Sequence, residues 1–239
     1  NFAVHRGIDS GYASWRSILS SRWPISGPPP LFASAQHYDE MVAMMVDAGL
    51  LMDERMVYWD IRPSSHLPTV EIRVADVQPT VDETELLATL IRALVMTATR
   101  GIVRGEPAPA VDLETLRAAT WVAARDGLTD EAIAPRAGRP VTPVHQLTAL
   151  VDHIHDSLDE LGEYRRARLL LRRQLELGNG AVWQRRALCD HRDTFEVLVR
   201  MAAHRTLQDT APLQEGRVHT GFGWPGSDRT DPRPTAANH

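Results

Sequence analysis

Apolar and polar residues alternate with a period of two between residues 69 and 77. Val70, Ile72 and Val74 alternate with Glu71 and Arg73. Successive side chains on a strand point to opposite faces of a sheet, so the pattern predicts a strand over 69–77. We expect Glu71 and Arg73 to share one face of this strand, and the three β-branched residues to be buried on the other face.

A second strand is predicted over 56–62, with a link from Pro63 to Pro68 that is too irregular for a tight hairpin. Helical spacing dominates the rest of the chain. Asp82, with Glu85 three residues later, predicts a capping box at the start of the longest helix. The predicted helices cover residues 36–48, 83–104, 112–126, 143–161, 163–177 and 193–208.

A few strands followed by a run of helices predict an α+β fold, in which helices flank an antiparallel sheet. Residues 1–34 are rich in Gly and Pro and are predicted to be mostly loop. Residues 209–239 are rich in Pro, Gly, Thr, Asp and Arg without apolar periodicity, which predicts a disordered tail. The domain is therefore expected to span residues 1–208.

The composition narrows the classes of function. The chain has 239 residues and a formal net charge of −5, which argues against a general nucleic-acid binder. A single cysteine, Cys189, excludes an internal disulfide framework and indicates a reducing cytoplasm. No run of 18 apolar residues occurs, so no membrane span is expected. The chain begins at Asn1 with a Gly-containing segment, as expected for part of a longer protein.

The pair of Glu71 and Arg73 is the first candidate for chemistry. On one face of a strand, two such residues lie roughly 7 Å apart. This arrangement suits a site that holds both a metal ion and a phosphate. It also suits a salt bridge on a solvated face, which is the plainer interpretation because such pairs are common and contribute little.

Three further candidate groups lie in or beside loops, where binding residues tend to occur. Asp9 and Gly11 favour a tight turn that presents Arg6 and Tyr12, although a turn with a buried tyrosine is the plainer interpretation. Arg62 precedes Pro63 at a strand end, where its guanidinium could bind carboxylate or phosphate. His66 could bind a metal or titrate near neutral pH, and Arg125 could bind a ligand. A simply exposed histidine and a helix-terminal arginine are the alternatives.

Five arginines crowd the segment 165–173. They predict either a solvated basic face or a contact with phosphate or an acidic partner. No glycine-rich phosphate loop occurs, because the two Gly-x-Gly sequences lack a strand before them and a helix after them.

Taken in order, several segments resemble the type 2 glutamate–cysteine ligases, also called carboxylate–amine ligases. The resemblance covers about residues 1–205 and is most specific in the central block. The segments are Asp9-Ser-Gly-Tyr12, Arg22-Trp-Pro-Ile-Ser-Gly, Trp59-Asp-Ile-Arg-Pro-Ser-Ser-His66, Thr69-Val-Glu-Ile-Arg-Val-Ala-Asp76, Ala123-Ala-Arg-Asp-Gly-Leu128 and the later Gly180-Ala-Val-Trp-Gln184-Arg185.

The resemblance implies a fold like the catalytic half of glutamine synthetase, incomplete in this chain. It implies an ATP-dependent reaction in which a carboxylate becomes an acyl phosphate and an amine then displaces phosphate to form an amide. Mg²⁺ or Mn²⁺ would bridge the ATP phosphates. The substrates would be a small-molecule carboxylate and amine, in the cytoplasm, and a homo-oligomer is left open.

The resemblance also implies roles for individual residues. Glu71 would bind the metal ion, and Arg73 would steady the transferred phosphate. Tyr12 would line the amine pocket. Arg62 and Arg125 would contact ligand or phosphate. Arg6 matches a position that binds carboxylate in some relatives, and His66 matches a motif position of unassigned role.

The chain departs from the family pattern in two respects, of which the smaller is that the segment before Asp9 differs from the family's usual Ser-Pro-Phe-Trp-like start. The family's first half carries a Gly-Val-Glu-x-Glu strand and further acidic and histidine ligands, which are absent here. This chain alone is therefore expected to be inactive. The alternative is a non-catalytic relative that keeps the fold and acts as a binding or interaction protein. A nucleic-acid or anion binder that uses the 165–173 arginines is disfavoured by the net charge.

Overall fold

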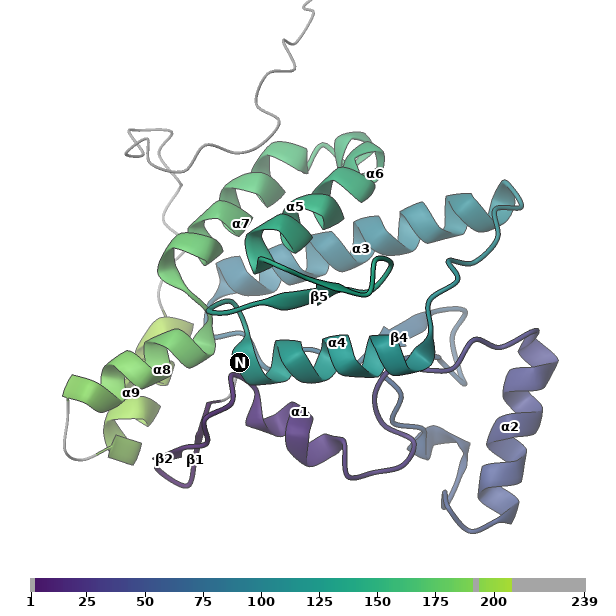
Figure 1. The fold of residues 1–239 in the computed structure, drawn as a ribbon, viewed down its shortest axis with the longest axis horizontal. Coiled ribbons are helices and arrows are strands. Elements are labelled where there is room, and N and C mark those ends of the chain that lie inside the picture. The colour runs from purple at the N-terminus through teal and green to yellow at the C-terminus, as the bar shows by residue number, and fades with distance from the viewer. Residues whose placement is uncertain (1–2, 191–193, 208–239) are drawn as a thin grey trace, which may run out of the picture. The chain divides into compact units, whose positions relative to one another are not determined.

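Three short antiparallel strand pairs and a set of helices make up the computed structural model, which describes residues 3–190 and 194–207 (Figure 1). The prediction of an α+β fold is confirmed at this level. The disordered tail predicted for residues 209–239 lies outside the described residues. The strands are β1 (Val4–His5), β2 (Ile8–Asp9), β3 (Ile61–Pro63), β4 (Val70–Ile72), β5 (Ala132–Ala134) and β6 (Arg139–Val141).

The first hairpin lies in the segment that we predicted to be mostly loop. Arg6 and Gly7 connect β1 to β2 with φ angles of 52° and 79°. A two-residue turn with positive φ at both positions matches the twist of the flanking strands, which explains how so short a hairpin forms. A short helix, α1 (Trp15–Ser20), follows, and the Ser14 side chain caps its first turn.

Strands β3 and β4 overlap the two predicted strands but are much shorter, and β3 shares only residues 61 and 62 with the predicted 56–62. Arg62 lies opposite Glu71 in their register. The prediction that the three β-branched residues are buried is wrong, because Val70 is 48% exposed, Val74 is 46% exposed, and Ile72 is only half-buried. The physical reason is that this sheet has two strands, and no further layer covers that face within residues 3–190 and 194–207.

Most α-helices agree with the sequence prediction to within a few residues, with three exceptions. Helices α1 and α8 were not predicted. The helix predicted over 143–161 is two helices, α5 and α6, which meet at the buried Ile154. The remaining elements are α2 (Ala35–Asp47), the 3₁₀ helix η1 (Glu54–Met56), α3 (Val81–Val103), α4 (Leu113–Asp126), α5 (Pro143–His153), α6 (His155–Glu160), α7 (Tyr164–Leu177), α8 (Gly180–Asp190) and α9 (Thr194–Thr206).

Helix α3 begins two residues earlier than predicted. Thr80 is its N-cap: the Thr80 hydroxyl accepts a hydrogen bond from the Glu83 amide at 3.2 Å and donates to the Glu83 carboxylate at 2.8 Å. The capping box predicted at Asp82 and Glu85 is therefore wrong, because a Thr-x-x-Glu box lies just upstream. Asp82 and Glu85 are left to form ion pairs with another helix.

That other helix is α7, which packs along α3 together with α6 (Figure 1). Arg166 lies 2.6 Å from Glu85 and 3.2 Å from Asp82, and Arg173 lies 2.6 Å from Asp82. The arginine-rich segment 165–173 thus has an acidic partner within its own chain. Leu158 of α6 is fully buried in this region.

One helix qualifies the prediction that no membrane span occurs. By length and composition alone, α3 is long and apolar enough to cross a bilayer, and 22% of its apolar window is buried inside the structure. A single helix of this kind is weak evidence, because core helices of soluble proteins pass the same test.

The elements that carry the candidate residues are held by two other sets of contacts. Helix α4 packs on α1 and β5, and α8 packs on α9 and β1. A separate core under α2 contains Val42, Met45, Val57 and Trp59. These contacts place the loop around Tyr12 beside the end of α4, and β3 beside α2.

Candidate functional site

The structure brings Arg62, Glu71 and Arg73 into one cluster on the β3–β4 pair. The Arg62 Nη2 atom lies 2.9 Å from Glu71 Oε2, and Arg62 Nε donates to the same oxygen at 3.0 Å. Arg73 Nη1 lies 3.3 Å from it. Glu71 and Arg73 therefore share a face, as predicted. Arg62, which lies opposite Glu71 on the neighbouring strand, is a second cation in the cluster. The alternation of residues along 69–77 did not predict its presence there.

The two arginines differ in how firmly they are held. Arg62 is 13% exposed and also donates to the backbone carbonyls of Arg55 and Val57, the latter at 3.0 Å. Arg73 is 40% exposed, and its guanidinium carbon lies 5.9 Å from the ring centre of Tyr58. Arg62 is thus fixed by internal acceptors, whereas Arg73 can reach a ligand by giving up one long contact.

The electrostatics of the cluster keep Glu71 ionised. The hydrogen bond from Arg62, with a smaller contribution from Arg73, holds the pKa of Glu71 below its ordinary value. Both arginines contact Oε2. Nearby, burial raises the pKa of Asp60, whose backbone carbonyl accepts a hydrogen bond from the Arg73 amide at 2.7 Å.

A metal site would need more than this one carboxylate. Within the described ranges 3–190 and 194–207, no group of three or more His, Cys, Asp or Glu side chains is placed to hold a metal ion. Glu71 can supply one oxygen ligand. Mg²⁺ commonly takes one or two carboxylates together with phosphates and waters, so Glu71 fits as part of such a site but does not complete it.

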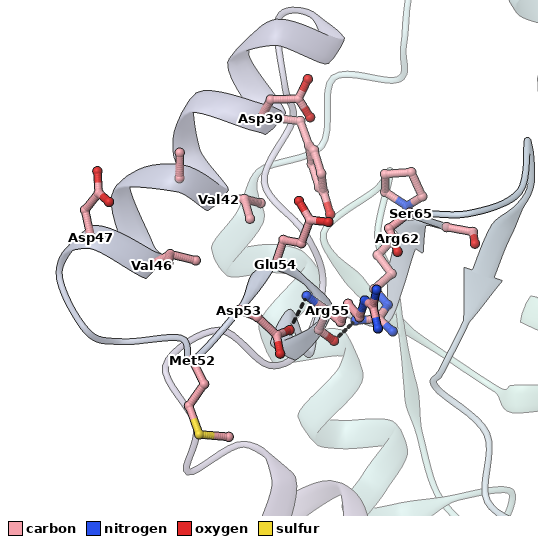
Figure 2. Close-up of a pocket in the computed structure, with 14 residues that line it drawn as sticks. Asp39, Val42, Val46, Asp47, Met52, Asp53, Glu54, Arg55, Arg62 and Ser65 are labelled. Carbon is pink, nitrogen blue, oxygen red and sulfur yellow. Dashed lines mark hydrogen bonds between the residues drawn. The ribbon is translucent and has the colours of Figure 1, made fainter.

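A cavity of about 780 Å³ opens beside Arg62 between α2, η1 and the end of β3 (Figure 2). Its volume falls in the range of small-molecule pockets. Figure 2 shows Arg62 on one wall, with Asp39, Asp47 and Glu54 presented by the facing elements. Its lining residues are Tyr38, Asp39, Val42, Ala43, Val46, Asp47, Met52, Asp53, Glu54, Arg55 and residues 62–65.

Tyr12 and Arg125 belong to a second, aromatic group. The ring centre of Tyr12 lies 5.4 Å from that of Trp15 and 6.4 Å from that of Trp121. Arg125 lies 4.8 Å from the Trp121 ring centre and makes a two-pronged ion pair with Asp126, with both contacts at 2.6 Å. Tyr12 and Arg125 therefore both lie next to Trp121, close enough to contribute to one binding surface.

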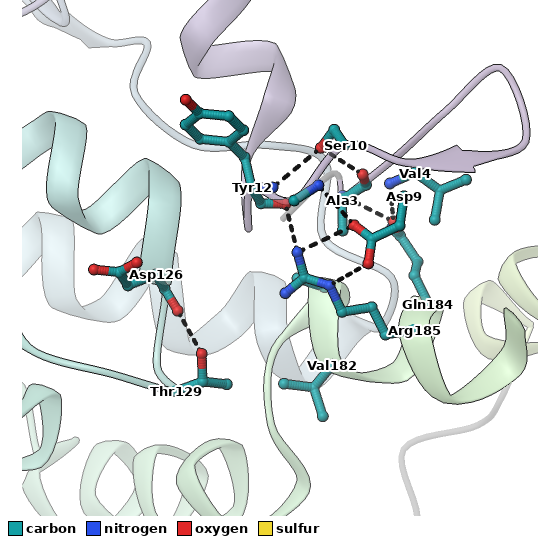
Figure 3. A network of polar contacts seen from close by, with 12 residues as sticks. Ala3, Val4, Asp9, Ser10, Tyr12, Asp126, Thr129, Val182, Gln184 and Arg185 are labelled. Atoms are coloured by element: carbon teal, nitrogen blue, oxygen red, sulfur yellow. Dashed lines mark hydrogen bonds and ion pairs between the residues drawn. The ribbon is translucent and has the colours of Figure 1, made fainter. Parts of the chain in front are cut away.

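The segment around Tyr12 is tied to helix α8, far along the chain (Figure 3). The Gln184 side-chain oxygen accepts hydrogen bonds from the Ala3 and Val4 amides at 2.9 and 3.1 Å. Arg185 pairs with Asp9 at 2.9 Å, and its guanidinium holds the pKa of Asp9 below the ordinary value. The first hairpin is thus fastened at both ends.

Arg185 also donates to the Tyr12 carbonyl at 3.1 Å. We predicted no role for Gln184 or Arg185. The pair of Asp9 and Arg185 is separated by 176 positions, so no local pattern could reveal it. The resemblance of 180–185 to a family segment was the one available signal.

Asp76 links the β4 segment to helix α1. It accepts hydrogen bonds from the Ser14 hydroxyl, at 2.9 Å, and from Arg16, and it is 11% exposed. Burial alone would raise its pKa, but these hydrogen bonds and nearby positive charge together outweigh burial, and the pKa of Asp76 lies below its ordinary value.

Replacing Asp76 with asparagine is expected to lower the free energy of unfolding at pH 7 by about 1–3 kcal/mol. A lowered pKa in the folded state stabilises the protein above the unfolded pKa, and this contribution is lost as the pH falls through the folded value. Urea unfolding at pH 7 and pH 3 should therefore show the difference between the wild type and the variant shrinking in acid. A constant difference would contradict the assignment, and Asp156→Asn, at a 97% exposed side chain, is the control.

Two predicted candidates lie apart from both groups. Arg6 is exposed at the tip of the first hairpin, and His66 is exposed in the loop between β3 and β4. Within the described part of the chain, neither makes a side-chain contact with the Glu71 cluster or with Tyr12. Besides Gln184 and Arg185, no role was predicted for Trp121 or Asp126, which both contact Arg125.

Comparison with known proteins gives a consistent family assignment. The model of the family described as "Glutamate-cysteine ligase family 2 (GCS2)" matches residues 4–202. A Mycolicibacterium smegmatis protein named "Putative glutamate–cysteine ligase 2-3" is 50% identical over 204 residues, which cover 85% of this chain and 56% of that protein. A Nocardia farcinica protein named "Putative glutamate–cysteine ligase 2-1" is 49% identical over 212 residues, which cover 89% of this chain and 55% of that protein. The chain therefore spans about half the length of the curated relatives it matches.

Proposed function

The chain belongs to glutamate–cysteine ligase family 2, and from this premise we propose that it forms part of an ATP-dependent carboxylate–amine ligase. The carboxylate oxygen attacks the γ-phosphorus of ATP, and ADP leaves. The amine nitrogen then attacks the acyl phosphate, and phosphate leaves as the amide forms and the amine loses a proton. The observation that carries the proposal is the Arg62–Glu71–Arg73 cluster, which lies inside the family match.

Arg73 is the residue best suited to the transferred phosphoryl group. Positive charge placed at the phosphoryl oxygens stabilises the transition state, and a planar guanidinium is well shaped for this task. Arg73 is half exposed and makes a single 3.3 Å contact with Glu71. Arg62, by contrast, has its donors used within the protein, so we assign it a positioning role: it holds the Glu71 carboxylate on its face of the sheet.

Glu71 would provide one ligand for Mg²⁺ or Mn²⁺. When bound, the ion adds positive charge at the phosphate oxygens of ATP. Phosphates, waters and carboxylates from outside the described residues would complete its coordination. Such a site agrees with a glutamine synthetase-like funnel of antiparallel strands, of which this chain would carry the β3–β4 pair.

The substrates would be small molecules in the cytoplasm rather than a nucleic acid. Tyr12 and Arg125 would line a substrate pocket around Trp121, where the arginine can bind a carboxylate and the aromatic rings an apolar body. Arg6 and His66 are exposed and could close on substrate from loops. Glutamate and cysteine are the substrates in the names of the relatives.

Titration of ATP tests the proposal. The aligned portion of the M. smegmatis relative is replaced by this chain, to give what we call the hybrid protein. Isothermal titration should show saturable ATP binding that requires Mg²⁺, and Glu71→Gln should weaken it at least about tenfold, or 1.4 kcal/mol. Glu114→Gln, at a 76% exposed side chain of α4, is the matched control and should bind normally. Absent binding, or unchanged affinity in Glu71→Gln, would refute the proposal.

A non-catalytic binding protein is the second candidate. It is favoured by one observation: the described residues contain no group of three metal-ligating side chains. Under this alternative the hybrid protein folds but shows no Mg²⁺-dependent affinity for ATP. The titration above therefore separates the two functions.

A further inference from the structure

Helix α3 is apolar on two faces. Leu86, Leu90 and Ala93 are buried, and α6 and α7 pack against the helix. A second set of side chains recurs every three or four residues, as along one face of a helix. We call this set the α3 stripe: Val81, Thr84, Ala88, Ile91, Val95, Ala98 and Ile102.

The α3 stripe is open to solvent. Val81 is 57% exposed, Val95 39% and Ile102 76%, and the smaller members Thr84, Ala88 and Ala98 are exposed as well. Ile91, in the middle of the stripe, is half-buried. A contiguous exposed apolar surface of this length therefore indicates a contact with another element.

A second, independent observation concerns the β3–β4 pair. Ile61, Val70 and Val74 are each between 46% and 48% exposed. A two-stranded sheet is marginally stable on its own and needs further strands or a packed layer. Helix and sheet both present apolar surface that the described residues leave uncovered.

We infer that the α3 stripe is the docking face for the portion of the family protein that this chain does not span. The matched relatives extend well beyond the match, because this chain covers 55–57% of their length. The docking element must present an apolar face at least five helical turns long. An amphipathic sheet face or helix of that remaining portion meets this requirement.

Two other occupants fit the surface less well. Two copies paired antiparallel about Ile91 would bring Arg92 of one copy close to Arg92 of the other, which is repulsive. A bilayer would have to accept the ion pairs of Arg92 with Glu163 and of Arg100 with Glu160, and charged side chains at membrane depth are costly.

Cysteine labelling of Ile102 tests the inference. In a Cys189→Ser background, Ile102→Cys is reacted with a maleimide in the chain alone and in the hybrid protein. We expect rapid labelling in the chain alone, and labelling at least about tenfold slower in the hybrid protein. Val199→Cys, at a 51% exposed site on α9, should show that the reagent works in both. Ala93→Cys, at a fully buried site, should stay protected and show that both proteins are folded.

Equal labelling of Ile102→Cys in the two folded proteins would overturn the inference. Protection in the chain alone that grows with protein concentration would assign the surface to a second copy. Protection caused by phosphatidylglycerol vesicles would assign it to a bilayer. The measurement requires neither ATP nor turnover, so its failure is distinct from failure of the proposed function.

Discussion

Replacing Arg73 with glutamine in the hybrid protein is expected to lower ligase turnover by about 10²–10³-fold, with little change in the free energy of unfolding. The loss follows because a neutral amide cannot offset charge that develops on the transferred phosphoryl oxygens. Stability should hold because Arg73 is 40% exposed and its contact with Glu71 is a surface ion pair, which contributes at most about 1 kcal/mol. ADP release measured with a carboxylate and an amine, and urea unfolding, report the two quantities.

Arg62→Gln is the matched comparison. It should lower the free energy of unfolding more than Arg73→Gln does. Arg62 is 13% exposed, and its removal would take its donors away from the Arg55 and Val57 carbonyls. It would also leave Glu71 Oε2 with only the 3.3 Å contact from Arg73. We expect a loss of about 2–3 kcal/mol in the free energy of unfolding, measured in the chain alone. Equal effects of the two substitutions on both quantities would contradict the division of roles between the arginines.

Local sequence patterns predicted most of the helices because each helix carries its own signals. Asp112 caps α4, and Gly127 ends it, as predicted. The same reasoning failed at the start of α3, where two candidate capping boxes overlap and the Thr80–Glu83 box determines the boundary. It also failed at Ile154, because the break between α5 and α6 depends on tertiary packing rather than on a local stop signal.

Part of the candidate site could be predicted because it also depends on a local sequence pattern. Glu71 and Arg73 are two residues apart, so the strand period alone places them on one face, and the 3.3 Å contact confirms it. Arg62 joins them through strand pairing, which depends on register. The ties of Arg185 to Asp9 and of Asp76 to Arg16 join distant segments, and only the folded chain reveals them. The prediction of buried β-branched residues failed because it assumed a full sheet.

The helical part of the chain provides the largest expected change in stability. Leu158 is completely buried on α6, which packs against both α3 and α7. Leu158→Ala is expected to lower the free energy of unfolding by about 3 kcal/mol, because it removes buried apolar surface and leaves a cavity. Urea unfolding of the chain alone measures this loss.

Leu177→Ala at the end of α7 is the control for this substitution. Leu177 is 50% exposed, so the same change of side chain should cost less than about 1 kcal/mol. If Leu158→Ala cost no more than Leu177→Ala, α6 would not form part of the core between α3 and α7. The α3 stripe would then lose its rigid support, because α3 is held from the opposite side by that core. A large loss of unfolding free energy for Leu158→Ala alone would therefore show that the core holds α3 in place. The α3 stripe would then be available for contact with another part of the family protein.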